Sequence, residues 1–319
     1  LGDVYKRQPK DSAGTIMTTE FLSLKKETQL EDALNYIKQN GNHCKSIYTS
    51  YVCQDKKLIG IVSTKDILLN DENIKWLNDN NISMVLSLDG RKEVHDYMRP
   101  DVGGHGTYDK VVKNFKKLVD SRDGNNYYLR GTFTNRNMDF SKDVLSMADE
   151  GFDILSVEPV VLKDSPYGFT KEDLPKIFAE YDKLTEIYLK RKKEGKGFFF
   201  FHFNIDLEHG PCVAKRLSGC GAGHEYYAVA ADGNMYPCHQ FAGRENYMLG
   251  NVFEGVKNKE LPKEFRKTHV LSKEKCRDCW AKFFCSGGCH ANADLFHGNI
   301  HEPYELGCEL QKKRCECAI

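Results

Sequence analysis

The feature that most constrains this 319-residue chain is the run CRDCWAKFFCSGGC at positions 276–289, which places four cysteines within fourteen residues. The chain has twelve cysteines, and ten of them lie from Cys212 onward. Such density indicates disulfides in a small secreted protein, but no secretory signal is recognisable at the start of the sequence. Cys-x2-Cys spacing in a protein that is not exported points to metal instead. We therefore expect the carboxyl-terminal third of the chain to fold around metal.

The cysteines from Cys212 to Cys308 follow the spacing C-x7-C-x12-G-x4-C, then C-x2-C-x5-C-x3-C, then one final cysteine. A Cys-x2-Cys pair on a tight turn directs two thiolates at one centre, and two further thiols complete a site for zinc or an iron–sulfur cluster. Seven or eight such cysteines suit two four-ligand centres. The CSGGC turn offers backbone amides that can donate hydrogen bonds to bridging sulfides. The dipeptide Asp232-Gly233 predicts a hairpin that delivers Cys238 from a strand end.

Composition excludes some classes of partner. The formal net charge is zero, with 40% hydrophobic and 29% charged residues, so we expect neither nucleic acid nor an anionic membrane, which both need a basic face. The longest apolar stretch, GFFFFHFNI at 197–205, is shorter than the roughly 18 residues of a membrane helix. We predict a cytoplasmic protein with no membrane span in this chain. The basic run at 190–196 is interpreted as the solvated end of a helix.

The amino-terminal part divides into two segments. Residues 1–8, LGDVYKRQ, are interpreted as a non-native scar and left out of the fold. Residues 9–74 predict a small βαββα unit, in which Thr28 and Glu31 form a capping box at the start of the first helix. The segments GTIMT and LIGIVSTKDIL resemble a CBS motif, most closely that of MgtE-type magnesium transporters. The resemblance implies a nucleotide-facing region at Thr64 and Asp66, but CBS motifs work in pairs and one copy is visible, so we expect a packed structural module.

Residues 75–205 alternate between strand and helix patterns. Strands are expected at 82–90, 126–134 and 152–161, and helices at 107–121, with Thr107 as its cap, at 139–151 and at 170–193. This alternation predicts an α/β fold with a parallel sheet or a βα barrel. Active sites in such folds lie at the carboxyl ends of the strands, which places Asp89, residues 130–132 and Glu158 on the functional rim. Three strand–helix units do not close a barrel.

The cysteine spacing matches the seven-cysteine SPASM pattern of radical S-adenosylmethionine (SAM) enzymes that modify peptides. Several segments are also similar to the maturases that build thioether bridges in SCIFF (six cysteines in forty-five) peptides: NISMVLSLDGRKEVHDYMRP, LRGTFT, FDILSVEPVV, GPCVAKRLSGCGAGHEY, YPCHQFAG and CELQKKR. This resemblance implies a partial radical SAM (βα) barrel at 75–205 and a SPASM domain with two [4Fe–4S] clusters at 206–319. It also implies a cysteine-rich precursor peptide as substrate and an electron donor such as a flavodoxin or ferredoxin.

The resemblance assigns ligands to both clusters. One would be held by Cys276, Cys279, Cys285 and Cys308. The other would be held by Cys220, Cys238 and Cys289, with its fourth iron bound by Cys212 or open to a thiolate of the peptide. Contacts to the cofactor's ribose and to the peptide are implied for Ser87, Asp89 and Arg130, for which the alternative roles are loop capping and a rim ion pair. Four histidines near the clusters in sequence are expected to be hydrogen-bonding or surface groups: His202, His239, His290 and His301.

The sequence lacks one motif that radical SAM chemistry requires. No CxxxCxxC occurs, and no cysteine lies between Cys53 and Cys212. The resemblance changes from one family to the other at about residues 70–76, so we expect a chimaeric chain that does not cleave S-adenosylmethionine reductively, and its catalytic residues stay unassigned. Three hypotheses follow: a fragment of a thioether-forming maturase, a stand-alone iron–sulfur electron-transfer module, and a CBS-regulated fusion that binds structural zinc.

Overall fold

The computed structural model describes residues 22–25, 27–28, 32, 36, 39, 49–54, 57–63, 71–101, 103–206, 208 and 210–319. The chain divides into two compact units, Leu1–Asn81 and Ile82–Ile319.

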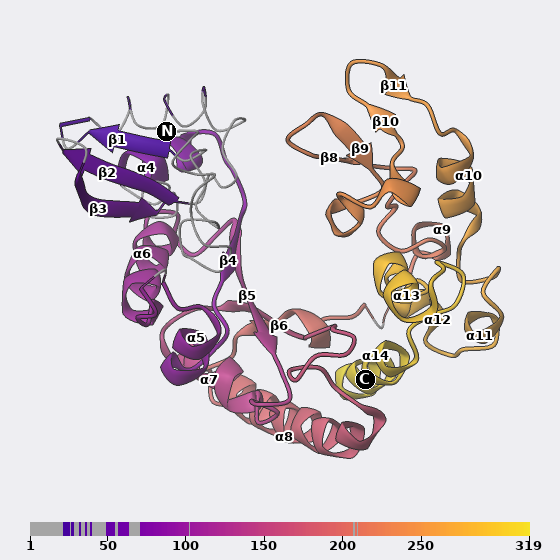
Figure 1. The fold of residues 1–319 in the computed structure, drawn as a ribbon. Coiled ribbons are helices and arrows are strands. Elements are labelled where there is room, and N and C mark those ends of the chain that lie inside the picture. Colours follow the sequence, from indigo (N-terminus) through magenta and orange to yellow (C-terminus); the bar gives the residue numbers. More distant parts are fainter. Residues whose placement is uncertain are drawn as a thin grey trace. The chain divides into compact units, whose positions relative to one another are not determined.

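The first unit contains a three-stranded sheet (Figure 1). Strand β1 (Leu22–Lys25) pairs in parallel with β2 (Thr49–Gln54), which pairs antiparallel with β3 (Lys57–Ser63). Helix α4 (Asp71–Asp79) follows. The two expected strands and their hairpin are confirmed, whereas Glu31, Thr64 and Asp66 lie outside the described residues.

The second unit opens with a four-stranded parallel sheet whose spatial order follows the chain (Figure 1). Its strands are β4 (Met84–Ser87), β5 (Tyr127–Phe133), β6 (Ile154–Pro159) and β7 (Phe199–Phe200). The helices between them are α5 (Lys92–Met98), α6 (Tyr108–Asp120), α7 (Ser141–Asp149) and α8 (Leu174–Lys193), the last preceded by the 3-10 turn η3 (Lys171–Asp173). The α/β class is confirmed. The sequence analysis missed α5 and β7, which are both short.

Helix α6 begins after Thr107, as its sequence predicts, but the Thr107 side chain does not cap it. The Thr107 hydroxyl donates instead to the carbonyl of Arg99 at 2.7 Å. Asp96 takes over the capping role, since its Oδ1 accepts a hydrogen bond from the backbone N–H of Tyr108 at 2.7 Å. A cap supplied from another helix leaves no local sequence signal.

One face of the parallel sheet packs against helices. Leu86, Leu129 and Leu155 are in register on neighbouring strands and are buried. The alternate positions of β4 and β5 are exposed: Val85 is 51% exposed and Tyr128 is 36% exposed. Because side chains alternate across a strand, the second face of these two strands is open, which is unusual for a parallel sheet.

The rest of the second unit combines short strands with helices (Figure 1). Strands β8 (Ala228–Val229), β9 (Asn234–Tyr236), β10 (Gly250–Asn251) and β11 (Gly255–Val256) form an antiparallel sheet in the order β11-β10-β9-β8. The helices are α9 (Val213–Arg216), α10 (Glu260–Lys267), α11 (Glu274–Arg277), α12 (Lys282–Cys285), α13 (His290–His297) and α14 (Glu305–Ala318). Three 3-10 turns complete it: η4 (Phe201–Phe203), η5 (His239–Phe241) and η6 (Glu245–Tyr247).

The core of this region gathers around Phe265 and Phe241, whose rings meet edge to face at 5.6 Å. Gly223 packs directly on Phe265: a Cβ there would lie 2.7 Å from Cγ of the ring, and its φ of +81° also favours glycine. The predicted hairpin is confirmed, since Gly233 has a φ of +82° and Asn234 N–H donates to Asp232 Oδ1 at 3.0 Å. It delivers Cys238 two residues after β9.

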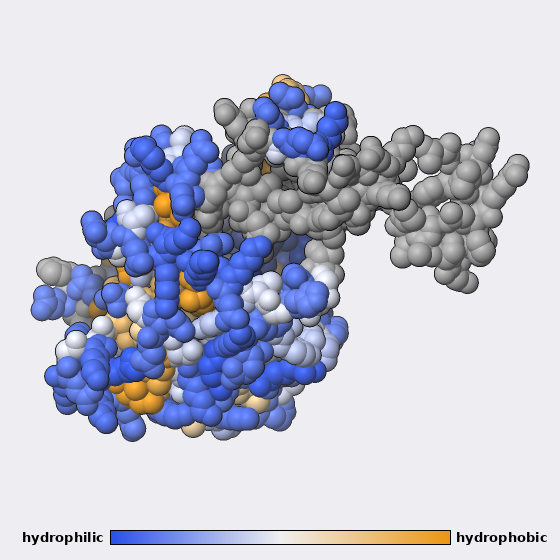
Figure 2. Space-filling view, turned by 90° about the vertical axis from the view of Figure 1, so that its left-hand side faces the viewer, coloured by the Kyte–Doolittle hydropathy of each residue, from blue (hydrophilic) through white to orange (hydrophobic). Residues whose placement is uncertain are grey.

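Among the described residues, no helix is both long and apolar enough to cross a membrane. The face drawn in Figure 2 is mainly hydrophilic, with smaller hydrophobic areas. The basic run ends helix α8 as predicted, with Lys190, Lys192 and Lys193 exposed to solvent.

Candidate metal centres

Four cysteines line one cavity of about 380 Å³ and form what we call the first cysteine group: Cys276, Cys279, Cys285 and Cys308. The one-turn helices α11 and α12 bring the first three together, because Cys279 N–H donates to the Cys276 carbonyl and Cys285 N–H to Ala281. Helix α14 supplies Cys308 from 23 positions further along the chain. Local turns and one long-range helix contact therefore build this group.

Electrostatics shows that these thiols face one another. Burial raises the pKa of Cys308 to about 12, and the neighbouring Cys285, Cys276 and Cys279 add to the shift. Burial also raises the pKa values of Cys276 and Cys285. Thiolates this close repel one another in a low-dielectric site, so a bound cationic centre is needed to keep them deprotonated.

A set of four thiols can serve more than one kind of metal. Zinc and a cubane iron–sulfur cluster both accept four thiolate ligands. Within the described part of the chain, no group of three or more His, Cys, Asp or Glu side chains forms a site for a single metal ion. The choice between the two therefore depends on the groups around the thiols.

The CSGGC turn supplies donors that fit such a cluster. Ser286 Oγ and His290 Nδ1 are buried and have no hydrogen-bond partner among the described residues. An unsatisfied buried polar atom costs roughly 1–3 kcal/mol, and cluster sulfides are acceptors that would satisfy it. Backbone N–H groups of Gly287 and Gly288 also donate to the thiol of Cys285. The residues present therefore fit an iron–sulfur group.

The second cysteine group consists of Cys220, Cys238 and Cys289, and the first of these contacts a phenol. The Tyr226 hydroxyl donates to Cys220 Sγ at 3.9 Å. Burial, together with the three thiols, raises the pKa of Tyr226 far above its usual value. Burial also raises the pKa of Cys238, and Cys289 and Cys220 add to the shift. The tyrosine is thus a fourth polar group at this site.

Cys212 precedes helix α9 and is exposed, as is Cys220. Its role as the fourth ligand stays a prediction. The sequence analysis named Cys212 for the fourth position of this group and missed Tyr226, which follows Cys220 by six residues in GCGAGHEYY. No spacing rule for metal ligands includes a tyrosine at that offset, so only the tertiary structure reveals it.

The residues expected to contact the cofactor lie on the sheet. Ser87 and Arg130 are in register on β4 and β5 and are both exposed on its open face. Asp89 is 3% exposed and pairs with Arg99 through two hydrogen bonds, from Nε at 2.6 Å and Nη2 at 3.1 Å. Thr132 N–H also donates to Asp89 Oδ1 at 2.9 Å. Asp89 thus forms the rim ion pair that was the alternative to ribose binding.

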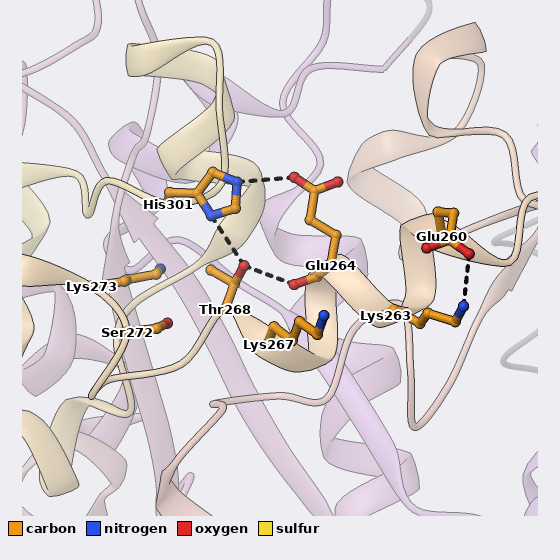
Figure 3. A pocket seen from close by; sticks show the side chains of 8 residues that line it. All are labelled: Glu260, Lys263, Glu264, Lys267, Thr268, Ser272, Lys273 and His301. Atoms are coloured by element: carbon orange, nitrogen blue, oxygen red, sulfur yellow. Dashed lines mark hydrogen bonds and ion pairs between the residues drawn. The ribbon is translucent and has the colours of Figure 1, made fainter.

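A polar hollow of about 420 Å³ lies beside α10 and contains a three-residue chain of hydrogen bonds (Figure 3). His301 approaches Glu264 Oε1 with Nε2 at 3.0 Å and Thr268 Oγ1 with Nδ1 at 3.2 Å. The order resembles a hydrolase triad, but Thr268 is 2% exposed and its hydroxyl donates to the Glu264 carbonyl at 2.8 Å. A buried hydroxyl that is bonded to its own helix is not a nucleophile. The three-residue chain of hydrogen bonds therefore closes the end of α10.

Comparison with known protein families identifies two parts of the chain. Residues 220–280 match the iron–sulfur cluster-binding domain named SPASM. This chain contains a SPASM domain. Residues 13–72 match the CBS domain, and 63 residues are 35% identical to the magnesium transporter MgtE of Enterococcus faecalis, covering 19% of this chain and 14% of the transporter.

The region that includes the SPASM domain has curated relatives. The cysteine-type anaerobic sulfatase-maturating enzyme of Clostridium novyi is 24% identical over 254 residues, which cover 73% of this chain and 64% of the enzyme. That of Clostridium perfringens strain 13 is 26% identical over 255 residues, covering 75% of this chain and 66% of the enzyme. The chain thus spans about two thirds of the length of these relatives.

Solved structures show the same fold. The structure of native anSMEcpe with bound AdoMet has a TM-score of 0.62 at 19% identity, covering 94% of this chain and 84% of that one. Native anSMEcpe with bound AdoMet and a Kp18Cys peptide has a TM-score of 0.61 at 20% identity, again covering 94% and 84%. The SPASM and CBS predictions and the homology to radical SAM maturases are confirmed, while the SCIFF type stays a prediction.

The last helix of the SPASM region is tied to the parallel sheet by a buried ionic network. Arg314 of α14 donates to Glu158 Oε2 at 3.1 Å and to the Tyr181 hydroxyl at 2.9 Å. His202 Nε2 lies 3.2 Å from Glu158 Oε1. Burial would raise the pKa of Glu158, but His202, Arg314 and Arg130 lower it well below its usual value. The helix that carries Cys308 is therefore anchored at the end of β6.

Proposed function

We propose that residues 75–319 form the substrate-side part of a radical SAM peptide maturase, with a partial barrel at 75–205 and a twin-cluster domain at 206–319. The first cysteine group would hold one [4Fe–4S] cluster, and the second group would hold another. The observation that carries this proposal is the pair of separate cysteine groups, of which Cys220, Cys238, Cys276 and Cys279 lie inside the residues that match a SPASM domain and the other three follow along the chain. The unsatisfied donors of the CSGGC turn support cluster binding.

The substrate would be a cysteine-rich precursor peptide of the SCIFF type, in which thioether bridges are installed. The short segments similar to SCIFF maturases support this choice. An iron with an open position in the second group would bind and deprotonate a cysteine thiol of the peptide. Cys212 is exposed, as is Cys220, so exposure leaves the fourth position to either Cys212 or a thiolate of the peptide. In the complete enzyme, Ser87, Asp89 and Arg130 would lie near S-adenosylmethionine.

The setting of this activity is the cytoplasm, with a flavodoxin or ferredoxin as electron donor. Low-potential clusters need such a donor, and their thiolate ligands need a reducing compartment. The amino-terminal unit, residues 9–74, would be a CBS-like module without an assigned ligand.

Metal content tests the proposal. The full chain, reconstituted with iron and sulfide under anaerobic conditions, should contain about eight iron and eight sulfide ions, because two cubanes carry that number. A variant with Cys276→Ala and Cys279→Ala should lose half of the iron, and so should one with Cys220→Ala and Cys238→Ala. Colourless protein with two zinc ions per chain would contradict the proposal and favour a CBS-regulated zinc fusion.

Peptide binding separates a maturase from an electron carrier. A cysteine-rich peptide should perturb the electron paramagnetic resonance (EPR) signal of the second centre, and the same peptide with serine in place of cysteine should not. A stand-alone electron-transfer module would hold both clusters and respond to neither peptide.

A further inference from the structure

Lys273 is a buried cation that the ligand assignment leaves unexplained. Its side chain is 2% exposed, and its Nζ donates to the carbonyl of Gly287 at 2.9 Å. Within the described part of the chain, no carboxylate lies within ion-pair distance of this ammonium. A buried ammonium is costly unless an anion compensates it, so the compensating charge has to come from another kind of group.

The position of Lys273 identifies that group. Gly287, which accepts its hydrogen bond, lies in the turn between Cys285 of the first cysteine group and Cys289 of the second. The Lys273 carbonyl accepts a hydrogen bond from Cys276 N–H at 3.0 Å. Burial lowers the pKa of its ammonium, and thiols of both groups oppose that shift: Cys276, Cys285 and Cys308 of the first and Cys289 of the second.

An anionic cluster in each group would supply the missing counter-charge. A cubane with cysteinate ligands is negatively charged and gains a further electron on reduction, so a nearby fixed cation stabilises the reduced form more than the oxidised form. Reduction potentials of such clusters respond to neighbouring charge, hydrogen bonds and solvent exposure. Burial strengthens the effect, because water screens the interaction less.

We propose that Lys273 is a positioning residue shared by the two iron–sulfur centres, whose charge raises the reduction potential of both. Its hydrogen bond to Gly287 also holds the CSGGC turn that joins one centre to the other. The inference rests on the proposed binding of two clusters, and it adds a single residue through which their potentials are coupled.

Three variants separate charge from hydrogen bonding. Lys273→Met removes both, Lys273→Gln keeps a donor without the charge, and Lys273→Arg keeps the charge. Lys267→Met is the matched control, because Lys267 lines the same polar hollow as Lys273 (Figure 3) but is exposed and belongs to the end of α10.

The test is an EPR-monitored redox titration of each reconstituted full-length variant, with iron content measured in parallel. We expect Lys273→Met and Lys273→Gln to disfavour reduction of both centres about tenfold, which is a shift of about 59 mV for a one-electron couple. Lys273→Arg and Lys267→Met should retain wild-type potentials. Should the Met variant fail to fold, the Gln variant carries the same comparison.

Some outcomes overturn the inference. Unchanged potentials in Lys273→Gln, or a shift confined to one centre, would refute a shared electrostatic role while the cluster assignment stands. A wild-type chain that binds no iron would refute the cluster assignment and the inference with it, so iron content distinguishes the two failures.

Discussion

At the residue scale, the second cysteine group depends on a hydrogen bond from a phenol. Tyr226 donates to Cys220 Sγ, and burial together with the thiols of the group raises its pKa. Its raised pKa keeps the phenol protonated at neutral pH, and so keeps it a donor. A donor to a ligand sulfur withdraws charge from a cluster and makes its reduction easier.

Tyr226→Phe should therefore lower the reduction potential of the second centre alone, because it removes one hydrogen bond worth roughly 1 kcal/mol. The first centre has no contact with this side chain in the described structure and should keep its potential. An EPR-monitored titration of both centres measures this. Cys212→Ala is the companion variant and should retain about eight irons per chain if the fourth iron is open. Equal shifts at both centres in Tyr226→Phe would contradict this role.

At the element scale, helix α14 links the parallel sheet of the second unit to the part that carries the cysteine groups. It carries Cys308 to the first cysteine group, and four residues from its carboxyl end it carries Arg314 to Glu158 at the end of β6. Tyr181 of α8 accepts a second hydrogen bond from the same guanidinium. Removing one partner of such a buried pair leaves an uncompensated charge, which makes the pair sensitive to protonation.

The Glu158 pair should make stability depend on pH in a defined direction. The pKa of Glu158 in the folded chain lies well below its ordinary value of 4.5, so the unfolded state binds the proton first as pH falls. The stabilisation is complete above pH 4.5 and is lost as pH falls from there through the folded-state pKa.

Urea unfolding of the full chain between pH 7 and pH 3 checks this prediction. The difference in unfolding free energy between the wild type and Glu158→Gln should shrink toward low pH. Asp109→Asn serves as control, because Asp109 pairs with Lys92 on the exposed surface, where water and salt screen the interaction. If the difference in unfolding free energy grew toward low pH, the result would contradict the prediction.

At the scale of the whole molecule, the parallel sheet is incomplete as an enzyme core. Its four strands do not form a closed barrel, and the open face of β4 and β5 exposes Val85 and Tyr128. The sequence contains no CxxxCxxC loop to hold the cluster that binds S-adenosylmethionine. Both observations agree with the prediction that this chain does not cleave S-adenosylmethionine reductively.

We accordingly expect no 5′-deoxyadenosine when the reconstituted chain is incubated with S-adenosylmethionine and dithionite. Reductive cleavage of the cofactor needs an iron that chelates it, and the sequence contains no CxxxCxxC loop to hold that iron. Liquid chromatography with mass spectrometry detects the product, and a complete radical SAM enzyme treated in parallel is the positive control. Product formed by this chain above the level of a protein-free blank would refute the expectation.

Much of the fold could be predicted because its signals are local. Alternating strand and helix patterns between residues 75 and 205 predicted the parallel sheet, and Asp232-Gly233 predicted the hairpin before Cys238. The short elements α5 and β7 were missed, since seven and two residues carry too little periodicity. The cap of α6 was misassigned to Thr107, because Asp96 reaches it from another helix.

The sequence by itself determined the α/β class, the number of cysteines available for metal and the absence of a CxxxCxxC motif, because each is written in composition or in spacing along the chain. Only the tertiary structure decided that Tyr226 donates to Cys220, that Lys273 lies between the two groups and that Arg314 meets Glu158. The physical reason is that charge and hydrogen bonding act through space. Arg314 and Glu158 are 156 residues apart in sequence but 3.1 Å apart in the folded chain.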